Sequence, residues 1–156
     1  MAAGFTVATA AATALVAATA KTLVNIIAGA NRQCIFCEVS NSFDGVTASA
    51  VPVLVELVES TQAGAGTPGT SPTPRLIRGL GAALATAAES YSAEPTVLTQ
   101  AKQWLVTPNG GLLVVQFPLG REPQTNVSGS ATILAMGLRD TAPAIVNARA
   151  YIEFEE

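Results

Sequence analysis

The sequence predicts an all-β protein, a jelly-roll-like antiparallel β-sandwich of seven or eight strands with at most one short helix. Three observations support this prediction. Apolar and polar residues alternate over several short segments, turn-rich stretches separate these segments, and strands do not alternate regularly with helices. At 156 residues, the chain is long enough for one domain to bury a sizeable core without disulfides or a metal.

The clearest strand signal is the C-terminal segment VNARAYIEFEE. Val146, Ile152 and Phe154 fall on one face of this segment, and polar side chains fall on the other. The segment Val51–Ser60 alternates in the same way. Further predicted strands lie near residues 22–27, 33–43, 96–106, 112–117 and 130–138.

Two segments between the strands differ from this pattern. Residues 61–74 contain three glycines and three prolines among small polar residues, which indicates a long exposed loop or a segment ordered by a partner. Residues 79–90 carry Leu80, Leu84 and Ala87 at helical spacing, so the one short helix is predicted there.

The segment QWLVTPNGGLLVVQFP, residues 103–118, predicts a β-hairpin. Two apolar runs flank Asn109 and Gly110, a dipeptide that suits the positive φ angles of a tight turn. The second run is apolar on both faces, which indicates that its own core covers one face and another element or subunit covers the other. Leu112 and Val114 share a face of this run and are predicted interface residues.

Residues 1–20 are rich in alanine and threonine, and we predict an N-terminal arm that precedes a single β-sandwich domain at residues 21–156. The arm is too weakly hydrophobic for a membrane span. An uncharged arm of small residues gains little by folding alone, but it can become ordered across a neighbouring subunit. Phe5 and Leu15 would anchor it there and are also predicted interface residues. An alanine-rich helix over about residues 9–28 is the alternative, which threonine and valine disfavour.

The two cysteines, Cys34 and Cys37, have the Cys-x-x-Cys spacing of redox and metal motifs. In a strand over residues 33–43, their side chains point to opposite sides of the sheet and cannot meet each other or a common metal ion. A zinc site needs two more ligands, and the chain has no histidine and no third cysteine. We therefore expect strand residues rather than a redox or metal motif, and no cofactor.

The composition disfavours several classes of function. The absence of histidine removes the commonest general base, and the eleven carboxylates are scattered, so we expect no enzyme activity. A glycosidase-like pair such as Glu56 with Glu153 is the alternative that the sequence leaves open. The net charge of −3 without a basic cluster argues against a nucleic-acid partner. Only 12% of residues are charged and 49% are hydrophobic, which suits a surface covered by other subunits.

Several phrases of the sequence, taken in order, resemble a group of small virion proteins of tailed bacteriophages that includes capsid decoration, or cement, proteins. These phrases are AATAKTLVNIIAGANR, SNSFDG, VPVLVELVESTQAG, VQFPLGREP and TAPAIVNARAYIEFEE, and the resemblance covers about residues 17–156. They are structural phrases and identify no catalytic residue.

The resemblance implies a jelly-roll-like sandwich bound to the outer surface of an icosahedral head, often as a trimer at symmetry axes. The implied partners are the major capsid protein and further copies of the chain, with neither nucleic acid nor membrane. Assembly in the host cytoplasm and a place on the outer capsid surface of the virion would follow. A phage tail or baseplate component, or a carbohydrate-binding sandwich module, is the alternative.

Overall fold

The computed structural model describes residues 2–44, 51–127 and 133–156 of the chain. Within these ranges the protein contains no helix and is built from strands in two antiparallel sheets. The strands are β1 (Gly4–Ala8), β2 (Thr13–Leu15), β3 (Ala20–Ile27), β4 (Ile35–Phe43), β5 (Val53–Ser60), β6 (Arg75–Arg78), β7 (Thr86–Glu89), β8 (Leu98–Val106), β9 (Leu112–Gln116), β10 (Ala135–Thr141) and β11 (Val146–Glu155).

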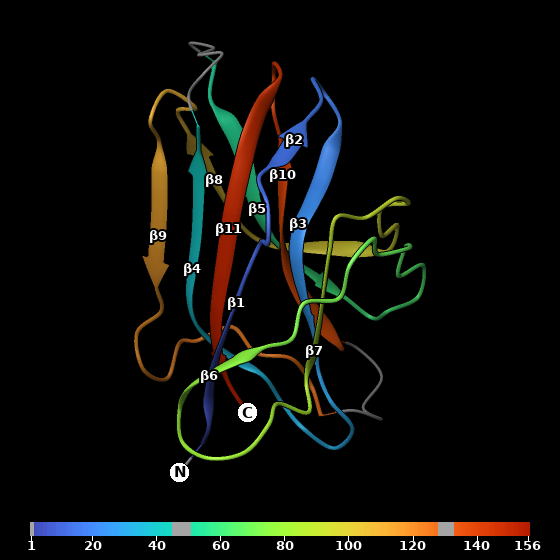
Figure 1. Ribbon diagram of the computed structural model, residues 1–156, viewed down its shortest axis with the longest axis vertical. Helices are drawn as coiled ribbons and strands as arrows, with labels where there is room; N and C mark the ends of the chain where they lie inside the picture. The colour runs from blue at the N-terminus through green and yellow to red at the C-terminus, as the bar shows by residue number, and fades with distance from the viewer. Residues whose placement is uncertain (1, 45–50, 128–132) are drawn as a thin grey trace.

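The two sheets form a jelly-roll sandwich, which confirms the predicted fold class. Sheet A has the strand order β6-β1-β11-β4-β9, with β2 also paired to β11, and sheet B has the order β7-β3-β10-β5-β8. The run β1-β11-β4-β9 in one sheet and the run β3-β10-β5-β8 in the other make up the eight strands of the jelly roll, and the chain crosses between the sheets at most connections. Figure 1 shows sheet A in front, with the long strand β11 at its centre.

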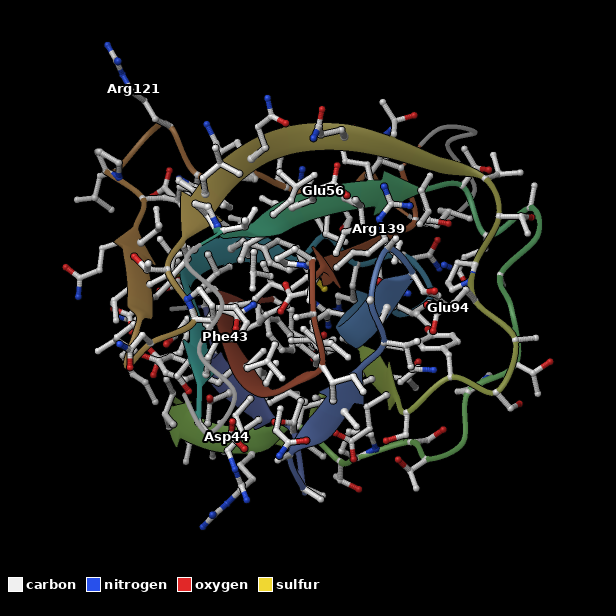
Figure 2. The ribbon with its side chains drawn as sticks, turned by 90° about the horizontal axis from the view of Figure 1, so that it is seen from above. Phe43, Asp44, Glu56, Glu94, Arg121 and Arg139 are labelled. Atoms are coloured by element: carbon white, nitrogen blue, oxygen red, sulfur yellow. The ribbon has the colours of Figure 1, made fainter. Side chains whose placement is uncertain are left out.

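The inward faces of the two sheets form one hydrophobic core (Figure 2). The ring of Phe154 on β11 lies 5.7 Å from that of Phe5 on β1 and 6.3 Å from that of Phe36 on β4, measured between centroids. Such tilted aromatic contacts add about 0.5–1.5 kcal/mol each to the burial of the rings. Val55 and Leu57 of β5 lie on the opposite side of the core and are fully buried.

The predicted N-terminal arm is wrong as a separate segment, because its residues belong to the sandwich. β1 pairs with β11 from Gly4 to Ala8, and β2 pairs with the other end of β11. Phe5 is 1% exposed and Leu15 is fully buried. The arm supplies one of the eight jelly-roll strands, and its alternating apolar residues are core rather than anchors on a neighbour. The alternative of a helix near residues 9–28 is also wrong, because β2 and β3 lie there.

The predicted helix at residues 79–90 is wrong as well. Gly79 and Gly81 have φ angles of +91° and +105°, which are incompatible with a right-handed helix. The second half of the segment forms β7, which pairs with β3. The structure has more strands than the seven or eight predicted. The strands that the sequence did not predict are short, with three to five residues each: β1, β2, β6 and β7.

The predicted hairpin at residues 103–118 is partly wrong. Both strands and the turn exist, and Gly110 has the expected positive φ of +67°. However, β8 pairs with β5 in sheet B, whereas β9 pairs with β4 in sheet A. The turn therefore crosses from one sheet to the other and brings β8 and β9 to the same side of the sandwich (Figure 1).

Candidate functional site

The strands β8 and β9 form one open side of the sandwich, which we call the β8–β9 edge. Each is the last strand of its sheet. Exposed apolar side chains lie on both outer faces beside this edge. Leu105 on β8, 72% exposed, is on the outer face of sheet B, and Leu112 and Val114 on β9, 66% and 48% exposed, are on the outer face of sheet A. The ammonium group of Lys102 lies 5.8 Å from the ring centroid of Phe117 and links the two strands across the edge.

The chain that forms this edge carries little charge, although Arg149 lies beside Leu112 and Glu38 binds Gln116 on the neighbouring strands of sheet A. No charged residue lies between Lys102 on β8 and Arg121 beyond β9. Arg121 points away from the molecule (Figure 2). Exposed apolar side chains with few charges beside them are typical of surfaces that another chain covers.

The outer face of sheet A beside this edge is polar. The hydroxyl of Tyr151 and the side-chain amide of Gln116 both donate hydrogen bonds to the carboxylate of Glu38, the latter at 2.6 Å. The bond to Glu38 is the main reason that the pKa of Tyr151 is raised. A shallow groove of about 290 Å³ lies next to this network, lined in part by Arg149, Tyr151 and Leu112.

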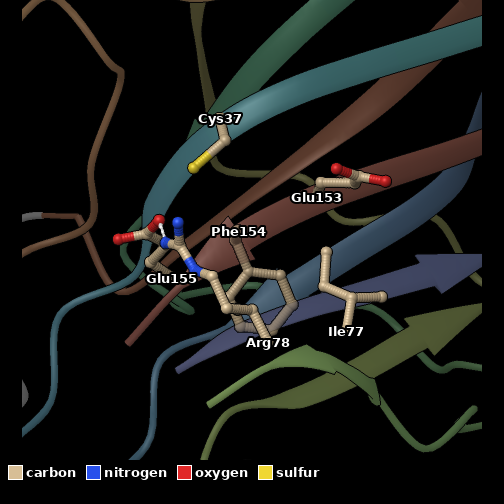
Figure 3. Close-up of a pocket in the computed structure, with 7 residues that line it drawn as sticks. Cys37, Ile77, Arg78, Glu153, Phe154 and Glu155 are labelled. Atoms are coloured by element: carbon tan, nitrogen blue, oxygen red, sulfur yellow. Dashed lines mark ion pairs between the residues drawn. The ribbon is translucent and has the colours of Figure 1, made fainter. Parts of the chain in front are cut away.

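A second pocket, of about 210 Å³, lies toward the opposite edge of sheet A (Figure 3). Cys37 points into it, and an ion pair between Arg78 and Glu155 lies beside the thiol. Burial raises the pKa of Cys37, nearby Glu122 raises it further, and Arg78 opposes this increase. The thiol is therefore held in its protonated form, which is the opposite of what a nucleophilic cysteine requires.

The two cysteines are free and lie on opposite sides of sheet A, as predicted. Cys34 is buried in the core, where desolvation raises its pKa to about 12. The pairing of β4 with β11 shifts register beside Cys37, because Phe36 and Glu38 face consecutive residues of β11. This irregularity turns Phe36 into the core, whereas strict alternation predicted that it shares a face with Glu38.

Two polar side chains meet inside the core. The amide of Asn41 on β4 donates to both carboxylate oxygens of Asp140 on β10, at 2.7 and 2.8 Å. Both side chains are fully buried, and the bond links sheet A to sheet B. Burial raises the pKa of Asp140 to about 7, the bond from Asn41 opposes this, and the carboxylate of Glu56 adds to it.

The carboxylates Glu56 and Glu153 do not form the glycosidase-like pair that the sequence left open. Glu56 lies on the outer side of sheet B, where Arg139 binds it with an Nη2–Oε2 distance of 2.9 Å. Glu153 lies on the outer side of sheet A beside the Cys37 pocket. The two sheets separate these carboxylates, so they cannot flank one glycosidic bond.

The structure separates the four predicted interface residues into two groups. Leu112 and Val114 lie together and exposed on β9, whereas Phe5 and Leu15 are buried in the core. The sequence analysis missed Leu105. It lies between Trp104 and Val106 in a continuous apolar run, and such a run carries no alternation that would separate an exposed residue from buried ones.

No family model, no curated protein and no solved structure matches this chain. Among residues 2–44, 51–127 and 133–156, no group of three or more histidine, cysteine, aspartate or glutamate side chains could hold a metal ion. The same part of the chain contains no helix that is long and apolar enough to cross a membrane.

Proposed function

We propose that this protein is a structural subunit of a tailed-bacteriophage virion that binds the outside of the head and stabilises the seams between capsomers. In this role it performs no catalysis and needs no cofactor. Its partners are the major capsid protein and further copies of the chain. The proposal places the protein on the outer capsid surface, assembled in the host cytoplasm and bound to neither nucleic acid nor membrane.

The observation that carries the proposal is the β8–β9 edge. Leu105, Leu112 and Val114 expose apolar surface there, and the nearest charged residues along the chain are Lys102 and Arg121. A decoration protein acts through area that it buries against its neighbours, and interfaces of about 1,600 Å² in total are the standard size for a specific contact. The resemblance of the sequence to phage decoration proteins supports the choice of the capsid as the partner.

The test is binding to undecorated heads of the phage that encodes the chain. We expect the wild-type protein to sediment with the heads, and we expect the Val114→Lys variant to bind less because it places a charge in the apolar edge. Leu76→Lys is the matched control, since Leu76 is also partly exposed but lies on β6 at the other end of sheet A. If neither wild type nor control sediments with heads, the proposed role is wrong.

The groove on the outer face of sheet A favours a second candidate, a carbohydrate-binding module of a phage tail or baseplate. A ring such as that of Tyr151 can stack on a sugar, and Arg149 beside it can donate hydrogen bonds to hydroxyl or carboxylate groups. Binding of glycans by wild type and its loss in Tyr151→Ala, without any binding to heads, would favour this candidate over the first.

A further inference from the structure

The two sheets end in four strands, and β2, which pairs only with β11, is a further edge of three residues. Three of the four end strands carry features that hinder pairing with another chain. β6 begins with Arg75 and ends with Arg78. β8 carries Lys102, and its pairing with β5 contains a register shift. β7 is partly covered by a loop, because Thr70 forms a bridge with Glu89. Charged residues, bulges and covering loops are the usual means by which proteins protect sheet edges.

β9 has none of these features. Its sequence, LLVVQ, contains no charged residue and no proline, and its pairing with β4 runs without a register shift. Among the four end strands of the part of the chain that the structure describes, β9 is the one that is left unprotected. The further edge β2 is also uncharged, but its three residues are too short a template. An uncharged apolar edge strand of this kind is a ready template for strand addition.

The backbone of β9 has a regular set of groups that face outward. The amide of Phe117 donates to a β4 carbonyl at 2.9 Å, and the carbonyl of Gly111 accepts from a β4 amide at 3.3 Å. Backbone groups alternate in direction along a strand, so those of the odd-numbered residues face β4. The N–H and C=O groups of Leu112, Val114 and Gln116 therefore point away from β4, toward the open side of the sheet.

We propose that β9 of a second copy of this chain adds to β9 in antiparallel orientation, about a two-fold axis that passes beside Val114. In this register Val114 pairs with Val114 of the second copy, and Leu112 pairs with its Gln116. Each pair exchanges two backbone hydrogen bonds, so the outward groups of all three residues are satisfied in both copies. The two copies of sheet A then form one continuous sheet.

A second copy is an occupant that β9 fits by charge and by register. Self-pairing about Val114 opposes Val114 with Val114 and Leu112 with Gln116, and none of these residues is charged. Because β9 carries no charge, two copies bring no like charges together, and the facing valines form a favourable β-branched pair.

Hydrogen exchange of the purified protein across a concentration series tests the pairing directly. We expect the amides of Leu112, Val114 and Gln116 to become protected as concentration rises, in step with a doubling of the molecular mass measured by sedimentation. The amides of Leu113 and Val115, which face β4, should be protected at every concentration. If exchange at Leu112, Val114 and Gln116 does not change with concentration and the mass stays that of one chain, the proposal is overturned.

Two variants separate pairing from folding. Val114→Pro removes an amide that faces away from β4, so it breaks the central pair of the dimer without removing a hydrogen bond of the monomer. Val114→Lys places two ammonium groups opposite each other across the axis. We expect both variants to sediment as single folded chains, and we expect Leu76→Lys on β6 to remain a dimer. If the Leu76 variant dissociates and the Val114 variants do not, β6 rather than β9 is the interface.

This inference goes beyond binding to phage heads, and the purified chain alone tests it. A dimer that fails to bind heads leaves the pairing intact and removes the capsid role. A trimer in solution, as the resemblance to decoration proteins implies, would overturn the two-fold pairing without affecting the capsid role. Protection of Val114 only in the presence of heads would assign β9 to the shell instead of a second copy.

Discussion

Replacement of Asp140 by asparagine should stabilise the protein at neutral and alkaline pH. Asp140 is fully buried between the sheets, and the side chain that meets its carboxyl group is the uncharged Asn41. Burial, opposed by the bond from Asn41 and increased by the nearby carboxylate of Glu56, raises its pKa from an ordinary value of 3.8 to about 7. The neutral amide of the Asp140→Asn variant keeps the shape of the protonated acid and removes the charge that the core disfavours.

The magnitude follows from proton linkage. Between pH 4 and pH 7 the native state holds a proton on Asp140 that the unfolded chain releases, so stability falls as pH rises through this window. Each tenfold change in proton affinity corresponds to about 1.4 kcal/mol. A carboxyl group that titrates near pH 7 instead of near 3.8 therefore loses up to about 4 kcal/mol of stability by pH 8.

Asn41 can also accommodate the protonated form of Asp140 at low pH. Its Oδ1 atom is buried and has no hydrogen-bond partner among the described residues. When Asp140 is protonated, a half-turn of the Asn41 amide puts Oδ1 in the place of Nδ2, where it can accept the acid proton. An asparagine in place of Asp140 can donate to Oδ1 in the same way.

Urea denaturation of wild type and Asp140→Asn from pH 4 to pH 8 measures the effect. We expect nearly equal stabilities at pH 4 and an advantage for the variant that grows with pH to a few kcal/mol. Glu59→Gln, a carboxylate on the neighbouring strand β5, is the control for the general effect of removing a negative charge. A difference between variant and wild type that stays constant from pH 4 to pH 8 would refute the assignment of a protonated acid in the core.

Three further predictions concern the turn, the N-terminus and the thiols. Gly110→Val should lower stability by about 1–3 kcal/mol, because valine disfavours the positive φ of this position. Gly111→Ala should lower stability further, because the new Cβ would lie 1.8 Å from the carbonyl oxygen of Thr107. Equal denaturation midpoints for both variants would contradict this prediction. Deletion of residues 2–18 should unfold the protein, as measured by circular dichroism, since it removes β1 and β2 from sheet A; a folded truncated chain would show that the core closes without them. Thiol titration should find two free thiols after unfolding in non-reducing conditions and slow reaction in the native state, and rapid labelling of the native protein would contradict the raised pKa of Cys37.

The fold could be predicted from the sequence because its longer strands alternate clearly. β5 and β11 have the predicted faces, with Val55 and Ile152 inside. The sequence analysis did not predict the eighth jelly-roll strand, β1, which has the sequence GFTVA. It lies in a stretch rich in alanine and threonine, where Phe5 and Val7 are the only two residues that show the alternation of a strand. Short strands acquire their structure from the neighbours with which they pair, and the pattern of one segment does not contain that information.

The candidate site could be predicted only in part. The continuous apolar run of β9 predicted that another element or subunit covers one of its faces. Leu112 and Val114 are exposed on the outer face of sheet A, and their role in an interface stays a prediction. The prediction that β8 and β9 pair with each other was wrong because a tight turn is compatible with a hairpin and with a crossing between two sheets. The outcome depends on the other strands that are available as partners. Here β8 pairs with β5 and β9 pairs with β4.

The distribution of charge, more than its amount, supports the proposal that β9 is the strand that binds a partner. The outer faces of the two sheets carry charged networks, such as Arg139 with Glu56 on sheet B and Glu38 with Tyr151 on sheet A, and β6 carries two arginines. Only 12% of the residues are charged, and these examples lie on the outer faces and on the edge strand β6. β9 has no charged residue. If the low charge merely reflected general composition, charged residues would be missing from all four sheet edges alike, and a lysine at Val114 would have no more effect on association than one at Leu76.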